Sequence, residues 1–315
     1  MKILANDGIA QSGIDALVSS GHEVLTINVA QDQLVEYIND KKVDVLLVRS
    51  ATTARKNLID SCPRLKMIGR GGVGMDNIDV DYARSKGCNV FNTPDASSNS
   101  VAELVFAHLS GMMRFLHDSN RQMPLEGESK FKELKKAYGN GSELRGKKIG
   151  IIGFGRIGKA VGRIAYGVGM HVQVHDPHIE SGDFEVLFSD GQKVSAKAKI
   201  LNLNEILTSS DIISIHIGGG AEIIGANELA KMKKGAFLIN AARGGVINEE
   251  ALDIALESQQ IAGAAIDVFK NEPNPAIKLL MNPSVSLTPH IGAATKEAQD
   301  RIGIELANQI IDLSK

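Results

Sequence analysis

Residues 149–158 read Ile-Gly-Ile-Ile-Gly-Phe-Gly-Arg-Ile-Gly, a short apolar run that leads directly into the pattern Gly-x-Gly-x-x-Gly. The run predicts a buried strand over Lys148–Ile152, and the apolar spacing of Arg156–Tyr166 predicts a helix immediately after the glycines. A second predicted strand, His171–His175, is followed by Asp176, 23 positions beyond the first glycine of the pattern. This order of strand, glycine turn, helix, strand and acidic residue predicts a dinucleotide-binding unit.

Each residue of this motif has a physical role. Gly153 allows the tight turn, Gly155 lets the backbone approach a pyrophosphate, and Gly158 lets the helix pack on the strand. The pyrophosphate would meet the amide groups and the positive end of the helix dipole. The carboxylate of Asp176 would accept hydrogen bonds from the adenosine ribose and repel a 2′-phosphate, so we expect NAD rather than NADP.

The same alternation of short apolar runs and amphipathic stretches extends along most of the chain, which predicts parallel sheets with crossover helices, an α/β chain. An Asp-Gly turn between Phe184–Phe188 and Gln192–Ile200 predicts an added β-hairpin. Further strands are predicted at Lys2–Ala5, Glu23–Val29, Val43–Val48, Leu65–Ile68, Cys88–Phe91, Asp211–Ile217, Ala236–Asn240, Ala262–Val268 and Val285–Leu287, and further helices at Ala10–Ser19, Leu34–Asn39 and Asn248–Ser258.

Two long helices are predicted where this alternation is interrupted, at Val101–Met123 and at Ala294–Leu313. Ser100 followed by Glu103 fits a capping box at the start of the first helix. We expect these helices to connect two α/β units. A chain of 315 residues is also long enough for about two domains.

The composition excludes several classes of protein. Hydrophobic residues make up 43% of the chain, which is too many for intrinsic disorder, and a net charge of −2 argues against a nucleic-acid partner. No apolar run reaches membrane-spanning length, and Asp7 comes too early for a signal peptide, so we expect no membrane partner and a cytoplasmic location. Cys62 and Cys88 have no metal-binding or disulfide spacing, and no metal is expected.

Three later segments each place polar residues just after an apolar strand, where α/β proteins form their sites. Phe237–Gly245 contains an arginine, Ala264–Pro273 contains carboxylates, and Ser286–Gly292 contains a histidine. This set suits the oxidation of a hydroxy acid. The imidazole takes the hydroxyl proton as hydride leaves the same carbon, a neighbouring carboxylate orients the imidazole, and the guanidinium binds the substrate carboxylate.

These segments and the glycine motif resemble the D-isomer-specific 2-hydroxyacid dehydrogenases over essentially the whole chain. The resemblance implies that Arg243 binds substrate, that His290 is the acid/base, and that Glu272 is the carboxylate beside it. It also implies that Asp267 holds the nicotinamide carboxamide. The other cofactor contacts that it implies are Arg156, Ile157, His216, Ala241 and Gly292.

The resemblance further implies an α/β fold of two doubly wound parallel-sheet domains. A Rossmann-type NAD-binding domain, residues 97–290, would be inserted in a flavodoxin-like substrate-binding domain, residues 1–96 and 291–315. A homodimer is implied as well. The apolar stripe of the helix predicted at Val101–Met123 either forms the interface or packs within its own chain; it comprises Ala102, Val105, Leu109, Met112 and Leu116.

The N-terminal segments Leu47–Thr52, Ile68–Asp79 and Ser98–Ser100 are most similar to those of short family members that oxidise D-3-phosphoglycerate. The reaction implied is its oxidation to 3-phosphohydroxypyruvate, the first step toward serine, with this small anionic 2-hydroxy acid as the partner. The substrate contacts implied are Arg49 for the phosphate, Ser50, Asn99, the Gly71–Gly74 amides (Gly72 and Val73 among them) as a nest for the carboxylate, and Arg70 as a second anion contact.

Two features depart from the family pattern: the residues after His216, and the Pro177–Leu203 hairpin, which is longer than expected. Residues 216–220 read His-Ile-Gly-Gly-Gly, where family members usually have a proline after the histidine. The chain ends at Lys315, so we expect no C-terminal regulatory domain. Two alternatives stay open: a dehydrogenase for glycerate/hydroxypyruvate or another D-2-hydroxy acid such as D-lactate, and an NAD-sensing corepressor or scaffold in which the catalytic residues are dispensable.

Overall fold

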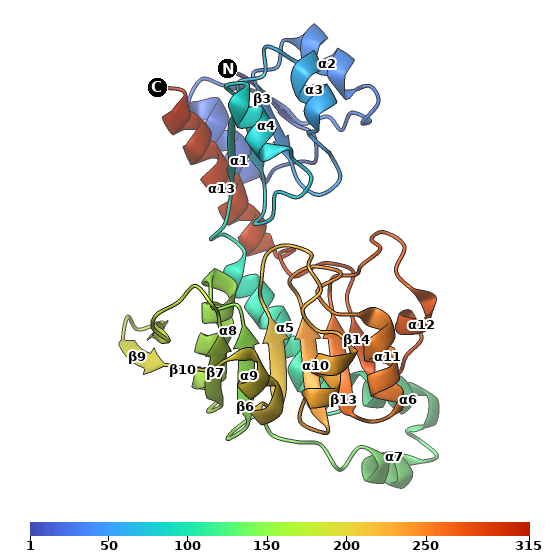
Figure 1. The fold of residues 1–315 in the computed structure, drawn as a ribbon. Coiled ribbons are helices and arrows are strands. Elements are labelled where there is room, and N and C mark those ends of the chain that lie inside the picture. The colour runs from blue at the N-terminus through green and yellow to red at the C-terminus, as the bar shows by residue number, and fades with distance from the viewer. The chain divides into compact units, whose positions relative to one another are not determined.

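The protein is described by a computed structural model of all 315 residues, and the chain divides into two units (Figure 1). Unit 1 comprises Met1–Ser100 and Ala293–Lys315, and unit 2 comprises Val101–Gly292. Unit 2 is therefore an insertion in the sequence of unit 1. The predicted boundaries after residues 96 and 290 compare with unit boundaries after residues 100 and 292.

Unit 1 is built on a five-stranded parallel sheet in the order β2-β1-β3-β4-β5, the flavodoxin-like order. Helices cover both faces: α1 and α13 pack on one face through Leu17 and Leu306, and α2, α3 and α4 pack on the other through Ile38, Leu58 and Ala83. The elements are β1 Lys2–Ala5, α1 Gln11–Ser19, β2 Glu23–Leu25, α2 Leu34–Lys41, β3 Val45–Val48, α3 Lys56–Ser61, β4 Met67–Arg70, α4 Val80–Ser85, β5 Asn89–Asn92 and α13 Lys296–Leu313.

Unit 2 is built on a seven-stranded parallel sheet in the order β10-β7-β6-β11-β12-β13-β14, which is the Rossmann order with one more strand. Apolar clusters cover both faces of this sheet. The chain order reverses between β6 and β11, so ligands of such folds bind there. The elements are β6 Lys148–Ile152, α8 Arg156–Gly167, β7 His171–His175, β10 Lys199–Ile200, α9 Leu203–Ser209, β11 Ile212–Ile215, α10 Ala226–Lys231, β12 Ala236–Asn240, α11 Glu249–Glu257, β13 Ile261–Ile266, α12 Ile277–Leu280 and β14 Val285–Leu287.

The single long helix predicted at Val101–Met123 is wrong. Two helices occupy this stretch, α5 at Ser98–Met113 and α6 at Leu116–Glu126, and they are followed by α7 at Phe131–Ala137. The break falls at Phe115, whose backbone is left-handed with φ of 52°. Its ring lies 6.1 Å from that of Tyr138, so a tertiary contact accompanies the break.

The capping box predicted at Ser100 and Glu103 is also wrong, because α5 begins two residues earlier, at Ser98. The Ser100 hydroxyl instead contacts the hydroxyl of Thr295 at 2.9 Å. Thr295 in turn caps α13 by accepting a hydrogen bond from the amide of Ala298, so α13 begins two residues later than the predicted start at Ala294.

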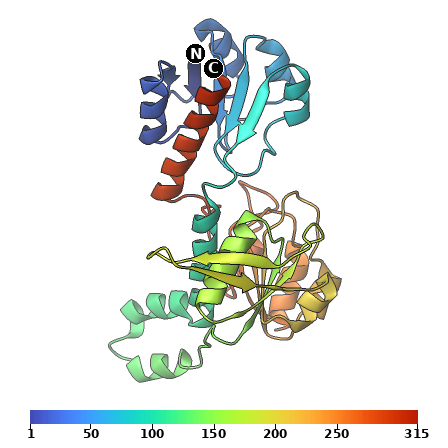
Figure 2. The same cartoon turned by 90° about the vertical axis from the view of Figure 1, so that its left-hand side faces the viewer.

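The hairpin predicted around Asp190-Gly191 is confirmed. β8 (Asp183–Leu187) pairs with β9 (Lys193–Lys197) in antiparallel register, and Gly191 has the positive φ of 86° that the turn requires. The hairpin packs on α8 in unit 2 (Figure 2), where the ring of Phe184 meets that of Phe154 edge to face at 5.7 Å.

No helix has the length and apolarity needed to span a bilayer. The two cysteines, Cys62 and Cys88, are unpaired and buried in unit 1. Burial raises the pKa of both thiols to about 11, so both are protonated at neutral pH.

Candidate active site

Three neighbouring strands of unit 2 bring the predicted catalytic residues to one edge of the sheet. Arg243 follows β12, Glu272 follows β13 and His290 follows β14. β13 pairs with both β12 and β14, and all three strands are parallel, so their carboxyl ends meet at the same edge.

His290 and Glu272 form a close pair at this edge. The Nδ1 atom of His290 lies 2.9 Å from Oε2 of Glu272, and the other carboxylate oxygen accepts a hydrogen bond from the amide of Phe269 at 2.9 Å. A carboxylate accepts hydrogen bonds only, so Nδ1 carries the proton and Nε2 is the nitrogen left to exchange one. Both side chains are partly open to solvent, as acid–base chemistry on a bound molecule requires.

Arg243 lies on a loop that packs directly against the segment leading to Glu272. A Cβ atom on Gly244 would lie 1.9 Å from the carbonyl oxygen of Phe269, so only glycine allows this approach. The buried Asn240 shapes the loop by donating to the carbonyl of Arg243 and accepting from the amide of Ala242. Arg243 and the His290–Glu272 pair are thus held by adjoining segments.

The glycine turn of unit 2 fits a dinucleotide. Gly153 has a positive φ of 88°, and a Cβ there would lie 2.4 Å from the carbonyl oxygen of His216. Above Gly155, by contrast, the space where a Cβ would stand is open within 4 Å. The N-cap residue of α8 is Gly155, which brings no side chain to the start of the helix, so the first amides of α8, that of Ile157 among them, suit a pyrophosphate.

Asp176 lies beside this turn with room for further hydrogen bonds. Its Oδ2 accepts from the amide of Phe154 at 2.8 Å, and its Oδ1 accepts from the amide of His178 at 2.9 Å. Each carboxylate oxygen has a second lone pair, which can accept from a ribose hydroxyl. The turn and the carboxylate are therefore joined before any ligand binds.

His216 and Ala241 begin the loops that follow β11 and β12. Nε2 of His216 contacts the Ser214 hydroxyl at 2.8 Å, while its Nδ1 is buried without a partner. Burial lowers the pKa of His216 to about 3, so the ring is neutral. A neutral ring with an unsatisfied nitrogen, on a residue whose backbone carbonyl lies against the turn at Gly153, is consistent with a cofactor contact.

The carboxylate of Asp267 already accepts several hydrogen bonds within the protein. The buried carboxylate accepts from the Thr288 hydroxyl and the Ile291 amide through Oδ1, and from the Gly292 amide through Oδ2. The predicted contact with a carboxamide therefore has to use the lone pair that remains on Oδ2. Gly292, a predicted cofactor contact, is buried and donates to this carboxylate.

In unit 1, two side chains that the sequence reading missed hold the loop of Arg49 and Ser50. Oδ2 of Asp7 accepts from the amides of Arg49 and Thr52, at 2.6 and 3.0 Å. The amide group of Asn77 donates to the carbonyls of the same two residues, at 2.7 and 2.6 Å. Asp7 thus pairs with the backbone of Arg49. The loop is fixed from both sides, which leaves the exposed Ser50 and the half-buried Arg49 at its surface.

The Gly71–Gly74 segment, which is predicted to bind a carboxylate through its amides, uses two of these amides within the protein. The amide of Gly71 donates to the carbonyl of Val48, and the amide of Gly72 donates to the Thr93 hydroxyl. Both amides therefore already have acceptors within the protein, which leaves the amide of the exposed Val73 as the next candidate donor to a substrate carboxylate. Asn99, in the first turn of α5, is exposed.

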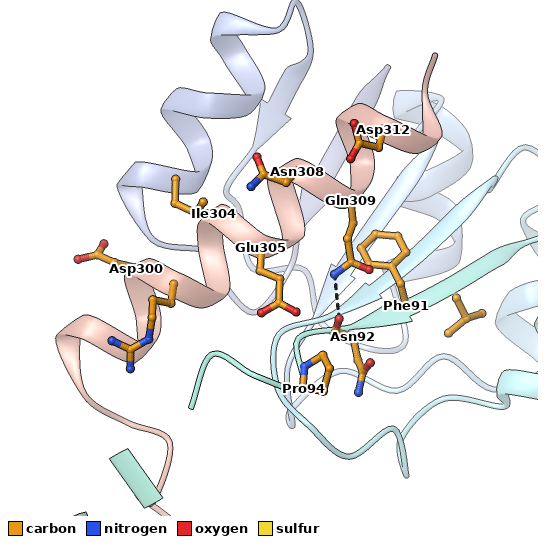
Figure 3. A pocket seen from close by; sticks show the side chains of 11 residues that line it. Phe91, Asn92, Pro94, Asp300, Ile304, Glu305, Asn308, Gln309 and Asp312 are labelled. Atoms are coloured by element: carbon orange, nitrogen blue, oxygen red, sulfur yellow. Dashed lines mark hydrogen bonds between the residues drawn. The ribbon is translucent and has the colours of Figure 1, made fainter. Parts of the chain in front are cut away.

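Unit 1 also contains a hollow of about 760 Å³ between α13 and β5, with Pro94 just after β5 also lining it (Figure 3). Gln309 crosses it and donates to the carbonyl of Asn92 at 2.9 Å. Asp300, Glu305 and Asp312 also line it, whereas none of the predicted substrate contacts does. This hollow is therefore separate from the loop of Arg49.

Comparisons with known proteins agree with this geometry. The family model described as D-isomer specific 2-hydroxyacid dehydrogenase, NAD binding domain, matches residues 106–292. The chain is 38% identical to D-3-phosphoglycerate dehydrogenase of Bacillus subtilis over its whole length but spans only 57% of that protein. It is also 38% identical to hydroxypyruvate reductase of Thermotoga maritima, with 98% of this chain and 97% of that protein covered.

Among solved structures, a glyoxylate reductase from Paecilomyes thermophila matches with a TM-score of 0.82 and 30% identity, covering 98% of this chain and 93% of that one. The matched family residues coincide with unit 2, where the glycine turn and the His290–Glu272 pair lie. The chain belongs to the D-isomer-specific 2-hydroxyacid dehydrogenase family, and unit 2 is its NAD-binding domain.

Proposed function

We propose that the chain is an NAD-dependent dehydrogenase that oxidises D-3-phosphoglycerate to 3-phosphohydroxypyruvate, a reaction that leads toward serine. The observation that carries the proposal is the 2.9 Å contact between His290 and Glu272 on the strand edge that also bears Arg243. A pure nucleotide binder has no need for this pair.

The bound nicotinamide supplies the carbon that accepts the hydride. Nε2 of His290 takes the proton of the substrate hydroxyl, because Nδ1 already donates to Glu272. Glu272 then stabilises the imidazolium that forms. Arg243 offers a fixed fork of donors, which bind the substrate carboxylate and polarise the developing carbonyl.

The proposed substrate rests on unit 1 and on the named relatives. The Arg49–Ser50 loop is held rigidly by Asp7 and Asn77, which presents a cation and a hydroxyl for a phosphate. Hydroxypyruvate reduction is the second candidate, because the relative of that name is matched over 97% of its own length.

The substrate is tested by measuring kcat/KM for 3-phosphohydroxypyruvate, hydroxypyruvate and pyruvate with NADH and with NADPH. We expect the phosphorylated acid and NADH to give the highest value, the latter because Asp176 repels a 2′-phosphate. A higher value for hydroxypyruvate favours the second candidate, and a higher value with NADPH contradicts the role of Asp176.

Arg49→Ala should raise KM for 3-phosphohydroxypyruvate by about 10- to 10²-fold and change KM for hydroxypyruvate little, because a hydrogen bond between charged groups contributes about 1.5–3 kcal/mol. The matched control is Arg55→Ala, which removes the same charge from the same unit but breaks an ion pair with Asp79 and a hydrogen bond to the carbonyl of Asp76. Equal increases in KM for both acids contradict the phosphate role.

We further propose a cytoplasmic homodimer. Most of the stripe predicted as a candidate interface packs within its own chain, since Ala102, Val105 and Leu109 lie in the core of unit 2, but Leu116 is 62% exposed on α6. The interface is assigned instead to α6 and α7, which have no buried residue and leave Leu125 76% and Phe131 57% exposed. Sedimentation velocity gives the mass in solution.

A further inference from the structure

One buried titratable side chain of unit 2 that the mechanism leaves unused is His108. His108 lies on α5, far in sequence from the catalytic residues, and is 7% exposed. Its Nδ1 is 2.7 Å from the hydroxyl of Ser286 on β14, and its Nε2 is 3.0 Å from the hydroxyl of Thr288 just after β14. Both ring nitrogens thus contact the segment that carries His290. We propose that His108 is a positioning residue for His290, acting through Thr288 and Asp267; this inference rests on the proposed role of His290.

The hydrogen bonds that connect Ser286, His108, Thr288 and Asp267 all run in one direction. Oδ1 of Asp267 lies 2.6 Å from the Thr288 hydroxyl. Because Asp267 receives donors on both oxygens, it is a carboxylate, and the Thr288 hydroxyl donates its only proton to it. The Thr288 oxygen must therefore accept from His108, which places the proton of the ring on Nε2.

The role of Nδ1, on the other side of the His108 ring, follows from the burial of that ring. Burial lowers the pKa of His108, although the nearby Asp267 carboxylate acts in the opposite direction. The ring is then neutral at neutral pH, and Nδ1 accepts from Ser286. Ser286, His108, Thr288 and Asp267 form a directed chain in which each hydrogen has one acceptor.

Asp267 connects this series of hydrogen bonds to the backbone beside His290. The same carboxylate accepts from the amides of Ile291 and Gly292, at 2.8 and 2.9 Å. His290 lies between Thr288 and these two amides and adopts a left-handed backbone with φ of 56°. A non-glycine residue keeps such a conformation only where its surroundings impose it. The chain from His108 supplies that restraint, and so holds the imidazole against Glu272.

The test compares His108→Leu, His108→Gln and the control Leu109→Ala in the full-length protein. His108→Leu removes both hydrogen bonds, whereas glutamine keeps a donor for Thr288 and an acceptor for Ser286. Leu109 is fully buried in the apolar core of unit 2 on the same helix and has no polar side-chain atom, so its truncation lowers Tm without removing a side-chain hydrogen bond.

We expect His108→Leu to lower kcat by about 10- to 10²-fold with the Kd for NADH unchanged, since small misplacements of catalytic groups have effects of this size. His108→Gln should stay near the wild-type kcat, and Leu109→Ala should lower Tm but not kcat. An unchanged kcat in His108→Leu, or an equal loss in Leu109→Ala, overturns the proposal.

Two readouts are independent of activity and separate this inference from the proposed function. Hydrogen exchange at the amides of Ile291 and Gly292 should become faster in His108→Leu and not in Leu109→Ala; unchanged protection in His108→Leu overturns the inference even if the wild type is active. Nitrogen NMR of the His108 ring should show a proton on Nε2, and a proton on Nδ1 alone contradicts the directed chain.

Discussion

Replacing His290 with alanine lowers kcat by about 10²- to 10⁴-fold, the usual contribution of general acid–base catalysis. The Nδ1 atom of His290 donates to Glu272 at 2.9 Å, so Nε2 of the same imidazole is the nitrogen that can take the hydroxyl proton. Steady-state kinetics with saturating NADH and 2-keto acid measure the effect.

The matched control is His171→Ala, since His171 is an exposed histidine of the same unit at the start of β7. It should turn over at the wild-type rate. Titration with NADH should give unchanged affinity for both variants, which shows that the fold and the cofactor site persist. Wild-type turnover of His290→Ala contradicts the acid/base role.

Arg243→Lys should lower kcat/KM by about 10²- to 10³-fold, the cost of removing one donor to a developing oxyanion. Lysine keeps the charge but loses the planar fork that matches a carboxylate. The loop itself should persist in the variant, because Asn240 and Gly244 shape it through contacts with backbone atoms.

Arg163→Lys is the control for this substitution. Arg163 lies on α8 of the same unit, where its Nε donates to the carbonyl of Glu185 at 2.7 Å. Its replacement should leave kcat/KM unchanged. If Arg243→Lys has no larger effect than Arg163→Lys, the guanidinium of Arg243 does not bind the substrate.

Much of the fold follows from local sequence patterns. β6 has the bounds that its apolar run predicts, because glycine ends the run and both faces are buried. β2 is shorter than its apolar pattern: Val29, within the predicted strand, is bonded instead to the side chain of Asn6, which a local pattern does not reveal. The break at Phe115 escaped prediction for a similar reason, since no Gly or Pro marks it and the apolar spacing continues past it.

The proposed catalytic residues were recognisable in the sequence because each lies in a short motif directly after a strand, as Arg243 and His290 do. The residues that hold the loops of these side chains in place could not be recognised in the sequence. Asp7 and Asn77 act on the backbone of a loop more than 25 residues away along the chain, and His108 reaches Thr288 across 180 residues. Such contacts depend on which strands become neighbours, so they appear only once the sheets have formed.

The central claim is that unit 2 binds NAD(H) and that its catalytic pair converts 2-keto acids into D-2-hydroxy acids. The most direct measurement follows the absorbance of the reduced nicotinamide while purified protein is mixed with NADH and 3-phosphohydroxypyruvate. We expect that absorbance to fall as NADH is oxidised, with one D-3-phosphoglycerate formed for each NADH consumed. Tight binding of NADH with no conversion of this or any other 2-keto acid would contradict it and leave only a nucleotide-binding protein.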